Sequence, residues 1–211
     1  MTAVKKVLSY YALPMYIMVR PFNGFYAMKY EKKGTLRLAI INFLMVSLSL
    51  SVTAQYASIT VIPRNPMTVN SLFDFISLVV AVLLFCTSNW AVTSLSDGEG
   101  RFKDIIMAVG YAMTPIVITF IPAAILSNFL TADEGAFYFM IINVAVFWFA
   151  VLVFAGLITV HNYTATKAIA TVFLTFIALL IIVFLITLLF TLWQQLVIFV
   201  TSLYTEIAFR V

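Results

Sequence analysis

The sequence predicts an all-α, polytopic membrane protein with five transmembrane helices and an interfacial amphipathic helix at each terminus. Hydrophobic residues make up 64% of the 211 residues and charged residues only 9%, and the mean hydropathy is +1.12. A soluble domain has about 45–50% apolar and about 25% charged residues. A soluble globule of the present composition would therefore expose large apolar patches. Segments of about 10 residues with alternating polarity, typical of membrane β-barrels, are absent from the sequence.

Charged and turn-forming clusters divide the chain into apolar stretches that are each long enough to cross a bilayer. A stretch of about 25 residues measures about 37 Å as an α-helix, which crosses the ~30 Å hydrocarbon layer with some tilt. These stretches define a membrane domain over residues 36–192. The predicted spans are Leu36–Ile62, Ser71–Leu95, Ile105–Leu130, Ala136–Val160 and Ala168–Leu192.

Two terminal segments flank this domain. Residues 1–35 contain the tyrosine-rich stretch Tyr10–Tyr16, which Pro14 interrupts and which is too short to cross the membrane. Tyrosine rings and basic residues favour the membrane interface, so this stretch is predicted to be an interfacial helix. The segment 1–35 is expected on the cytoplasmic side.

The C-terminal tail, residues 193–211, differs from the spans because Gln194 and Gln195 interrupt its apolar run. We expect it to form an amphipathic helix that lies on the outer leaflet or docks on a partner. A sixth crossing is the alternative, although it would bring Glu206 or Arg210 close to an interface. The apolar residues of the tail recur at helical spacing and are Leu196, Val200, Leu203 and Ile207.

The distribution of basic residues predicts the orientation of the chain. In a five-span topology ten lysines and arginines lie on the side of the N-terminus and two, Arg64 and Arg210, on the other. The positive-inside rule then places the N-terminus in the cytoplasm and the C-terminus outside. The ten residues on the N-terminal side are Lys5, Lys6, Arg20, Lys29, Lys32, Lys33, Arg37, Arg101, Lys103 and Lys167.

The residue inventory argues against catalysis. With one histidine, His161, and one cysteine, Cys86, the chain lacks the ligands of a metal cluster and a Cys–His pair. Its glycines form no phosphate-binding motif. A pump would require ionisable groups inside the membrane, and no charged residue lies in the middle of a predicted span. We expect no catalytic residue, cofactor, metal or nucleic-acid partner; His161 is expected to be a bonded interfacial residue and Cys86 a packing residue.

Two features of the spans leave alternatives open. Pro115 and Pro122 lie about two helical turns apart in the third span and predict kinks, which fit either a curved, tightly packed helix or a functional hinge. Amides lie within four of the spans, and they either pair at helix contacts or line the cavity of a small transporter or channel. The amides are Asn42, Gln55, Asn89, Asn128 and Asn143.

The loop Ser94–Asp104 on the predicted cytoplasmic side combines alternating charges with Gly98 and Gly100. The Asp-Gly pair and the second glycine predict sharp bends. The loop is either a solvated turn or a docking site for a partner. Its candidate partner-binding charges are Asp97, Glu99, Arg101 and Lys103.

Several short motifs occur together in the chain. They are Asn89-Trp90 followed by Leu95-x-Asp97-Gly98-Glu99-Gly100-x-Phe102-Lys103, then Gly110-Tyr111-x-x-Thr114-Pro115, and the N-terminal Arg20-Pro21-Phe22-x-Gly24-Phe25 with Lys29-Tyr30-Glu31. These motifs resemble the bacterial branch of the Yip (Ypt/Rab-interacting protein) domain family. The resemblance implies five spans and a cytoplasmic N-terminus. The resemblance implies that eukaryotic relatives engage Rab GTPases and carry a long cytoplasmic N-terminal region with an Asp-Leu-Tyr-Gly-Pro motif. That motif is absent here, so a Rab partner is not expected.

We therefore expect a non-enzymatic, multi-pass protein of a bacterial cytoplasmic membrane that acts as an accessory or scaffold subunit of a larger membrane complex. Its expected partners are membrane lipid and other integral membrane proteins. The resemblance alone implies subunits of a carbohydrate ABC-type importer as the complex. A small transporter or channel lined by the intramembrane amides is the alternative.

Overall fold

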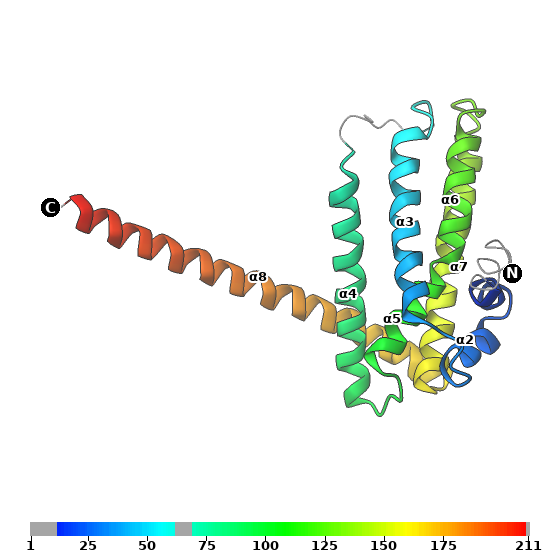
Figure 1. Cartoon of the computed structure of the whole chain (residues 1–211), viewed down its shortest axis with the longest axis horizontal. Coiled ribbons are helices and arrows are strands. Elements are labelled where there is room, and N and C mark those ends of the chain that lie inside the picture. Colours follow the sequence, from blue (N-terminus) through cyan, green and yellow to red (C-terminus); the bar gives the residue numbers. More distant parts are fainter. Residues whose placement is uncertain (1–11, 62–68, 210–211) are drawn as a thin grey trace, which may run out of the picture.

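The computed structural model describes residues 12–61 and 69–209, which form helices and no strands. Predictions on Lys5, Lys6, Tyr10, Arg64 and Arg210 lie outside these residues. Residues 12–19 are helical and are followed by seven labelled helices (Figure 1). These are α2 (Pro21–Lys29), α3 (Leu36–Tyr56), α4 (Ser71–Leu95), α5 (Phe102–Ala112), α6 (Thr114–Ser127), α7 (Gly135–His161) and α8 (Ala165–Phe209).

The prediction of five membrane-crossing helices is confirmed. Among the described residues five helical stretches are long and apolar enough to span a bilayer, with α5 and α6 together forming the third. The chain is an all-helical, multi-pass membrane protein. The five stretches are Leu36–Tyr56, Ser71–Leu95, Phe102–Ser127, Gly135–His161 and Ala165–Phe209.

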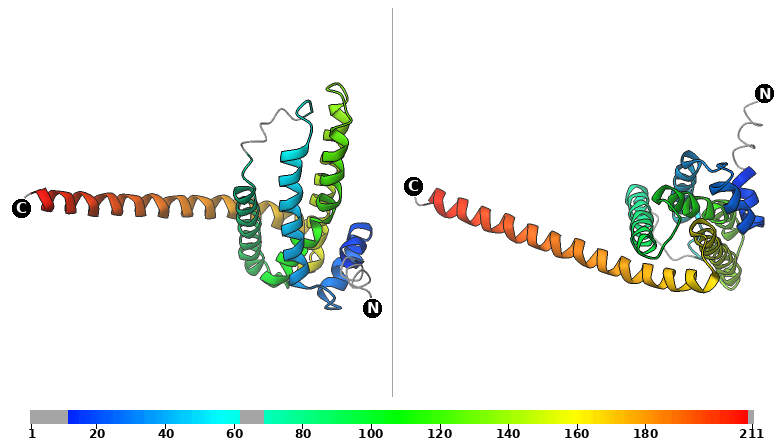
Figure 2. Two further views of the ribbon diagram at one scale, coloured as in Figure 1. Left: turned by 45° about the horizontal axis from the view of Figure 1, so that its top comes forward. Right: turned by 90° about the horizontal axis from the view of Figure 1, so that it is seen from below.

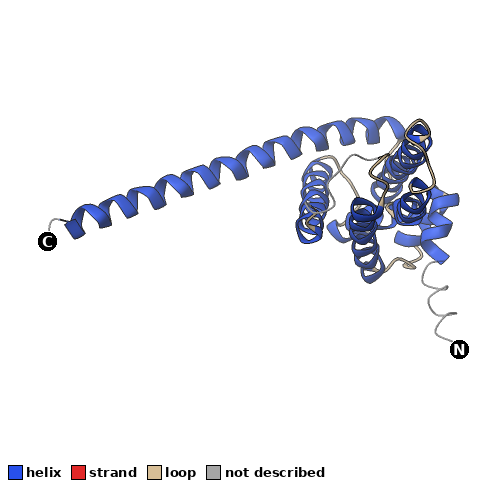
Figure 3. Cartoon of the chain, turned by 90° about the horizontal axis from the view of Figure 1, so that it is seen from above, coloured by secondary structure: helices blue, strands red, loops and turns tan. Residues whose placement is uncertain are grey.

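The helices α3, α4, α5–α6 and α7 run alongside one another as a bundle (Figures 1 and 3). One end of the bundle, here called the elbow end, carries α2, the turn after α7 and residues 96–101 between α4 and α5, here called the elbow. Residues 12–19 lie against α7, because the indole N–H of Trp148 donates to the carbonyl of Met18 at 3.2 Å.

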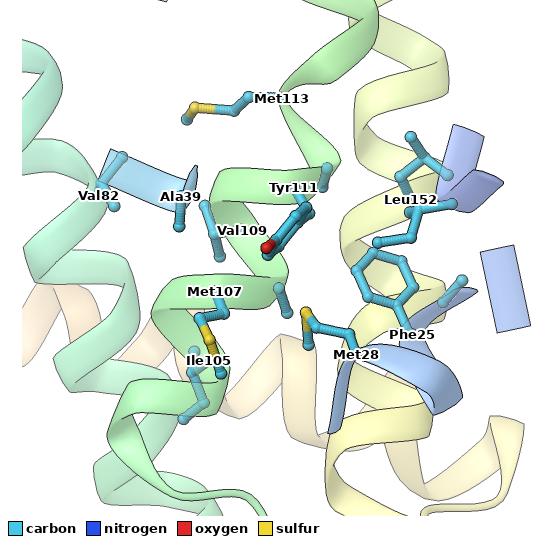
Figure 4. Close-up of a cluster of buried hydrophobic side chains, with 14 of the residues drawn as sticks. Phe25, Met28, Ala39, Val82, Ile105, Met107, Val109, Tyr111, Met113 and Leu152 are labelled. Carbon is cyan, nitrogen blue, oxygen red and sulfur yellow. The ribbon is translucent and has the colours of Figure 1, made fainter. Parts of the chain in front are cut away.

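The centre of the bundle is α5, whose residues 107–112 are all buried. Tyr111 is fully buried and, as Figure 4 shows, lies between the side chains of α5 and the Phe25, Met28 and Leu152 side chains of α2 and α7. A Cβ on Gly110 would lie 2.7 Å from the Cβ of Ala39. Glycine therefore allows α3 and α5 to approach as closely as small-residue contacts between membrane helices require.

The third span is broken at Met113, two residues before Pro115. Proline has no N–H for the carbonyl of Tyr111, four residues earlier, and the hydroxyl of Thr114 donates to that carbonyl at 2.6 Å instead. The side-chain N–H₂ of Asn42 donates to the carbonyl of Gly110 at 3.1 Å. Because neighbouring polar groups satisfy the carbonyls at the break, the geometry favours the packing interpretation of Pro115 over a hinge.

The C-terminal part of the chain differs from the expectation that the last span ends at Leu192. Helix α8 continues without interruption from Ala165 to Phe209, because glutamine is a good helix former and this stretch contains neither glycine nor proline. Gln194 and Gln195 therefore do not separate a tail from the span. There is also no reversal in α8 that a sixth crossing would need.

Helix α8 contacts the bundle through its N-terminal part, where Ala168, Thr171 and Thr175 are buried. Beyond this part it leaves the bundle at a steep inclination and projects far past the other helices (Figure 2). The uncharged stretch from Ala168 to Thr205 would measure about 55 Å. Such a helix stays within a hydrocarbon layer of ~30 Å only when it tilts by about 60° from the bilayer normal. The large angle between α8 and the bundle is therefore compatible with a single long crossing.

Candidate functional site

The elbow end is held together by a continuous set of polar contacts that begins at the end of α7. Asn162 ends this helix in the left-handed conformation, with φ of 55°, which asparagine tolerates better than most residues. The N–H of Tyr163 then bonds to the carbonyl of Ile158 at 3.0 Å. The resulting sharp turn starts α8 only a few residues later, beside α4.

His161, which is 1% exposed, connects the elbow to three helices. Its Nδ1 accepts the backbone N–H of Gly100 at 3.3 Å, so the ring proton resides on Nε2 and points to Oδ1 of Asn89 at 3.2 Å. The amide N–H₂ of Asn89 donates to Oγ1 of Thr175 at 3.1 Å. Both ring nitrogens are therefore occupied by structural bonds, as expected for a bonded interfacial histidine.

The two glycines of the elbow allow it to lie directly on the His161 ring. A Cβ added to Gly98 would lie 2.7 Å from Nδ1 of His161, and one added to Gly100 would lie 2.6 Å from Cε1. Tyr163 stacks on the same ring, with centroids 5.4 Å apart, and its hydroxyl donates to the carbonyl of Ser96 at 3.0 Å. The predicted sharp bends thus form a turn packed against the end of α7.

Glu99 joins α2 to this turn. Its carboxylate accepts the Asn162 amide at 3.2 Å and the Tyr30 hydroxyl at 3.0 Å, and these two bonds hold the pKa of Glu99 below the ordinary glutamate value. The Lys29 ammonium lies 3.5 Å from the carboxylate and donates to the carbonyl of Val160 at 2.7 Å. Lys29 is thereby held between the elbow and α7.

The other predicted docking charges of the loop are exposed. Asp97 is exposed and adopts a positive φ of 54°. The backbone N–H of Arg101 bonds to the Asp104 carboxylate at 3.2 Å at the start of α5, and Lys103 is exposed. Of the four candidate charges, Glu99 is therefore the one bound into the fold.

The remaining candidate residues lie elsewhere in the molecule. Pro115 is buried at the start of α6, and Pro122 is exposed further along the same helix. The tail residues are all on the projecting part of α8, away from the elbow, and all are exposed. They are Leu196, Val200, Leu203 and Ile207.

The intramembrane amides do not converge on one cavity. Asn42 bonds across the α3–α5 contact, Asn89 bonds to α8, Asn128 bonds to the carbonyl of Tyr56 at 2.9 Å, and Gln55 bonds to Ser71 at 3.3 Å. Separate pairing at helix contacts is the outcome that disfavours the channel alternative. Asn143 differs, because it is exposed on α7 and bonds to no other described residue.

The roles of Lys29, Tyr30 and Asn162 were not predicted from the sequence. Their partner, Glu99, lies 63 to 70 positions away along the chain and cannot be found from spacing alone. The signal that was present is the polar Asn162 directly after a long apolar span, which marks a helix end with a left-handed residue.

A bundle of membrane-crossing helices, with the short helix α2 and a hydrogen-bonded glycine elbow packed at one end, defines a multi-pass helical membrane protein. Comparison with known protein families identifies the family: the chain belongs to the Yip1 domain family, whose model matches residues 15–203. The family resemblance of the sequence is thus confirmed. No match was found among curated proteins or among solved structures.

Proposed function

We propose that this protein is a non-enzymatic accessory or scaffold subunit that binds another integral membrane protein within the bilayer. The observation that carries the proposal is α8. From residue 183 to Phe209 every side chain of α8 is exposed, so the helix offers a long apolar surface that its own bundle does not use. A membrane helix of this kind meets either lipid or a neighbouring transmembrane helix.

Unpaired amides favour a protein neighbour over lipid. Asn143 on α7 and Gln194 and Gln195 on α8 are exposed, and no other described residue bonds to them. Amides in hydrocarbon are stabilised when a facing helix supplies a hydrogen bond, with about 0.6–2 kcal/mol for each contact. Three such groups on the open membrane surface support a contact with a second polypeptide.

The proposed orientation follows the basic residues, with the elbow end in the cytoplasm and the end of α8 outside. The resemblance to the bacterial branch of the Yip family suggests a bacterial cytoplasmic membrane as its location. The elbow then faces the cytoplasm, where its exposed charges Asp97 and Arg101, and Lys103 beside it, would orient a partner. The family resemblance suggests a carbohydrate ABC-type importer as the specific complex.

The proposal is tested by affinity purification of the full chain from membranes in a mild detergent, followed by identification of bound integral membrane proteins. The double variant Leu203→Ser with Ile207→Ser is compared with Leu72→Ser with Ile76→Ser, a matched pair of exposed α4 residues at the same spacing. Loss of a partner from the α8 variant alone supports the proposal. Equal recovery of the same partners with both variants contradicts it.

A further inference from the structure

The structure contains a cleft at the elbow end that the proposed function does not use. It lies between α2, the elbow and the end of α7, and its volume is about 590 Å³, within the range of small-molecule sites. Its walls combine aromatic rings with amide, hydroxyl and carboxylate oxygens. The lining residues are Phe22, Asn23, Tyr26, Tyr30, Glu99, Ile158, Thr159, Asn162 and Tyr163.

The charged residue that lines the cleft, among the described residues, is acidic. Glu99 is the carboxylate in its wall, its side chain is 52% exposed, and no lysine, arginine or histidine is among the described residues that line it. The nearby Lys29 is 12% exposed and already donates to Val160, Glu99 and Tyr30. The cleft therefore presents acceptors to a ligand and has no free cation of its own.

The aromatic rings add a second preference for a cation. Tyr26 and Tyr30 lie together, with ring centroids 4.8 Å apart, and both are exposed beside Phe22. The face of an aromatic ring attracts an ammonium group. Lys29 already lies 4.5 Å above the Tyr30 ring, which shows that this wall accommodates an ammonium, while the exposed Tyr26 ring remains accessible.

The position of the cleft indicates where the cation comes from. Ile158 and Thr159 on its floor belong to the last turn of a membrane-crossing helix. Tyrosine rings at the end of such a helix lie at the level of the lipid head groups. We infer that the cleft binds the primary ammonium of an aminophospholipid head group, held by Glu99 and the Tyr26 ring, with Asn23 and Asn162 able to donate to its phosphate.

The test uses the purified full chain, delipidated in mild detergent, and native mass spectrometry with phosphatidylethanolamine and phosphatidylglycerol of identical acyl chains. The wild type binds phosphatidylethanolamine in preference. Glu99→Gln and Tyr26→Ala each reduce that affinity by about fivefold and leave phosphatidylglycerol binding unchanged. Glu134→Gln and Phe137→Ala, which change an exposed carboxylate and an exposed ring at the opposite end, keep the preference of the wild type.

Melting temperatures establish that each variant is folded before its lipid binding is compared. Equal binding of the two lipids by the wild type, or an unchanged preference in the folded Tyr26→Ala variant, overturns the inference. A lysine-containing tripeptide serves as a competitor for the second source of an ammonium group. If the peptide displaces phosphatidylethanolamine at equal concentration, the cleft recognises a protein side chain and the lipid assignment is wrong.

Discussion

The backbone N–H of Gly100 donates to Nδ1 of His161 at 3.3 Å, and this bond joins the elbow to the end of α7. It also fixes the ring proton on Nε2, which faces Asn89. The elbow, α4 and α7 are thereby connected through one buried imidazole. Asn89 extends the same connection to Thr175 of α8.

Gly100→Ala is expected to destabilise the fold. The new Cβ would lie 2.6 Å from both Cε1 of His161 and Cγ1 of Val160, and overpacking of this kind costs about 1–3 kcal/mol. Gly135→Ala is the control, because its Cβ would meet only Val61 at 3.6 Å. Thermal unfolding in detergent should show a lower midpoint for Gly100→Ala alone; equal midpoints for the two variants would argue against the packed elbow.

Pro115→Ala is expected to leave partner binding intact. Alanine restores an N–H for the Tyr111 carbonyl, which Thr114 now satisfies at 2.6 Å, so we expect a change in stability within about 1 kcal/mol. The variant should fold and recover the same partners in affinity purification. A variant that folds normally yet loses its partners would identify the break at Met113 as a functional hinge.

The bonds of Glu99 predict a pH dependence. The Asn162 amide and the Tyr30 hydroxyl lower the pKa of Glu99 in the folded state, so the stabilisation is fully present above the ordinary glutamate pKa and is lost as the pH falls through the folded value. The melting temperature of the wild type should be higher than that of Glu99→Gln at pH 7, and this difference should shrink below about pH 4. A difference that is constant across this range would contradict the assigned role of the carboxylate.

The proposed orientation can be checked with single cysteines in a chain whose buried Cys86 is replaced by alanine. A cysteine at Asp133 should react with an impermeant thiol reagent in intact cells. A cysteine at Lys103, beside the elbow, should react only after the cells are opened. The opposite pattern would invert the orientation that the basic residues predict.

The spans were predictable because apolar length alone identifies a membrane helix, and Ser71–Leu95 has the same bounds in sequence and structure. The length of α8 was not predictable in this way. Gln194 and Gln195 suggested a boundary, although glutamine is a good helix former. The contacts of Glu99 were also beyond the sequence. They depend on α2 lying beside the end of α7, which only the three-dimensional packing brings about.

The central claim, that α8 binds another membrane protein, is tested most directly by photo-cross-linking in cells. A photoreactive amino acid at Leu203 on α8 is compared with one at Ile76 on α4, since both side chains are exposed in the structure. The account predicts a discrete adduct with another integral membrane protein from Leu203 and little from Ile76. Adducts with lipid alone at both positions would contradict it.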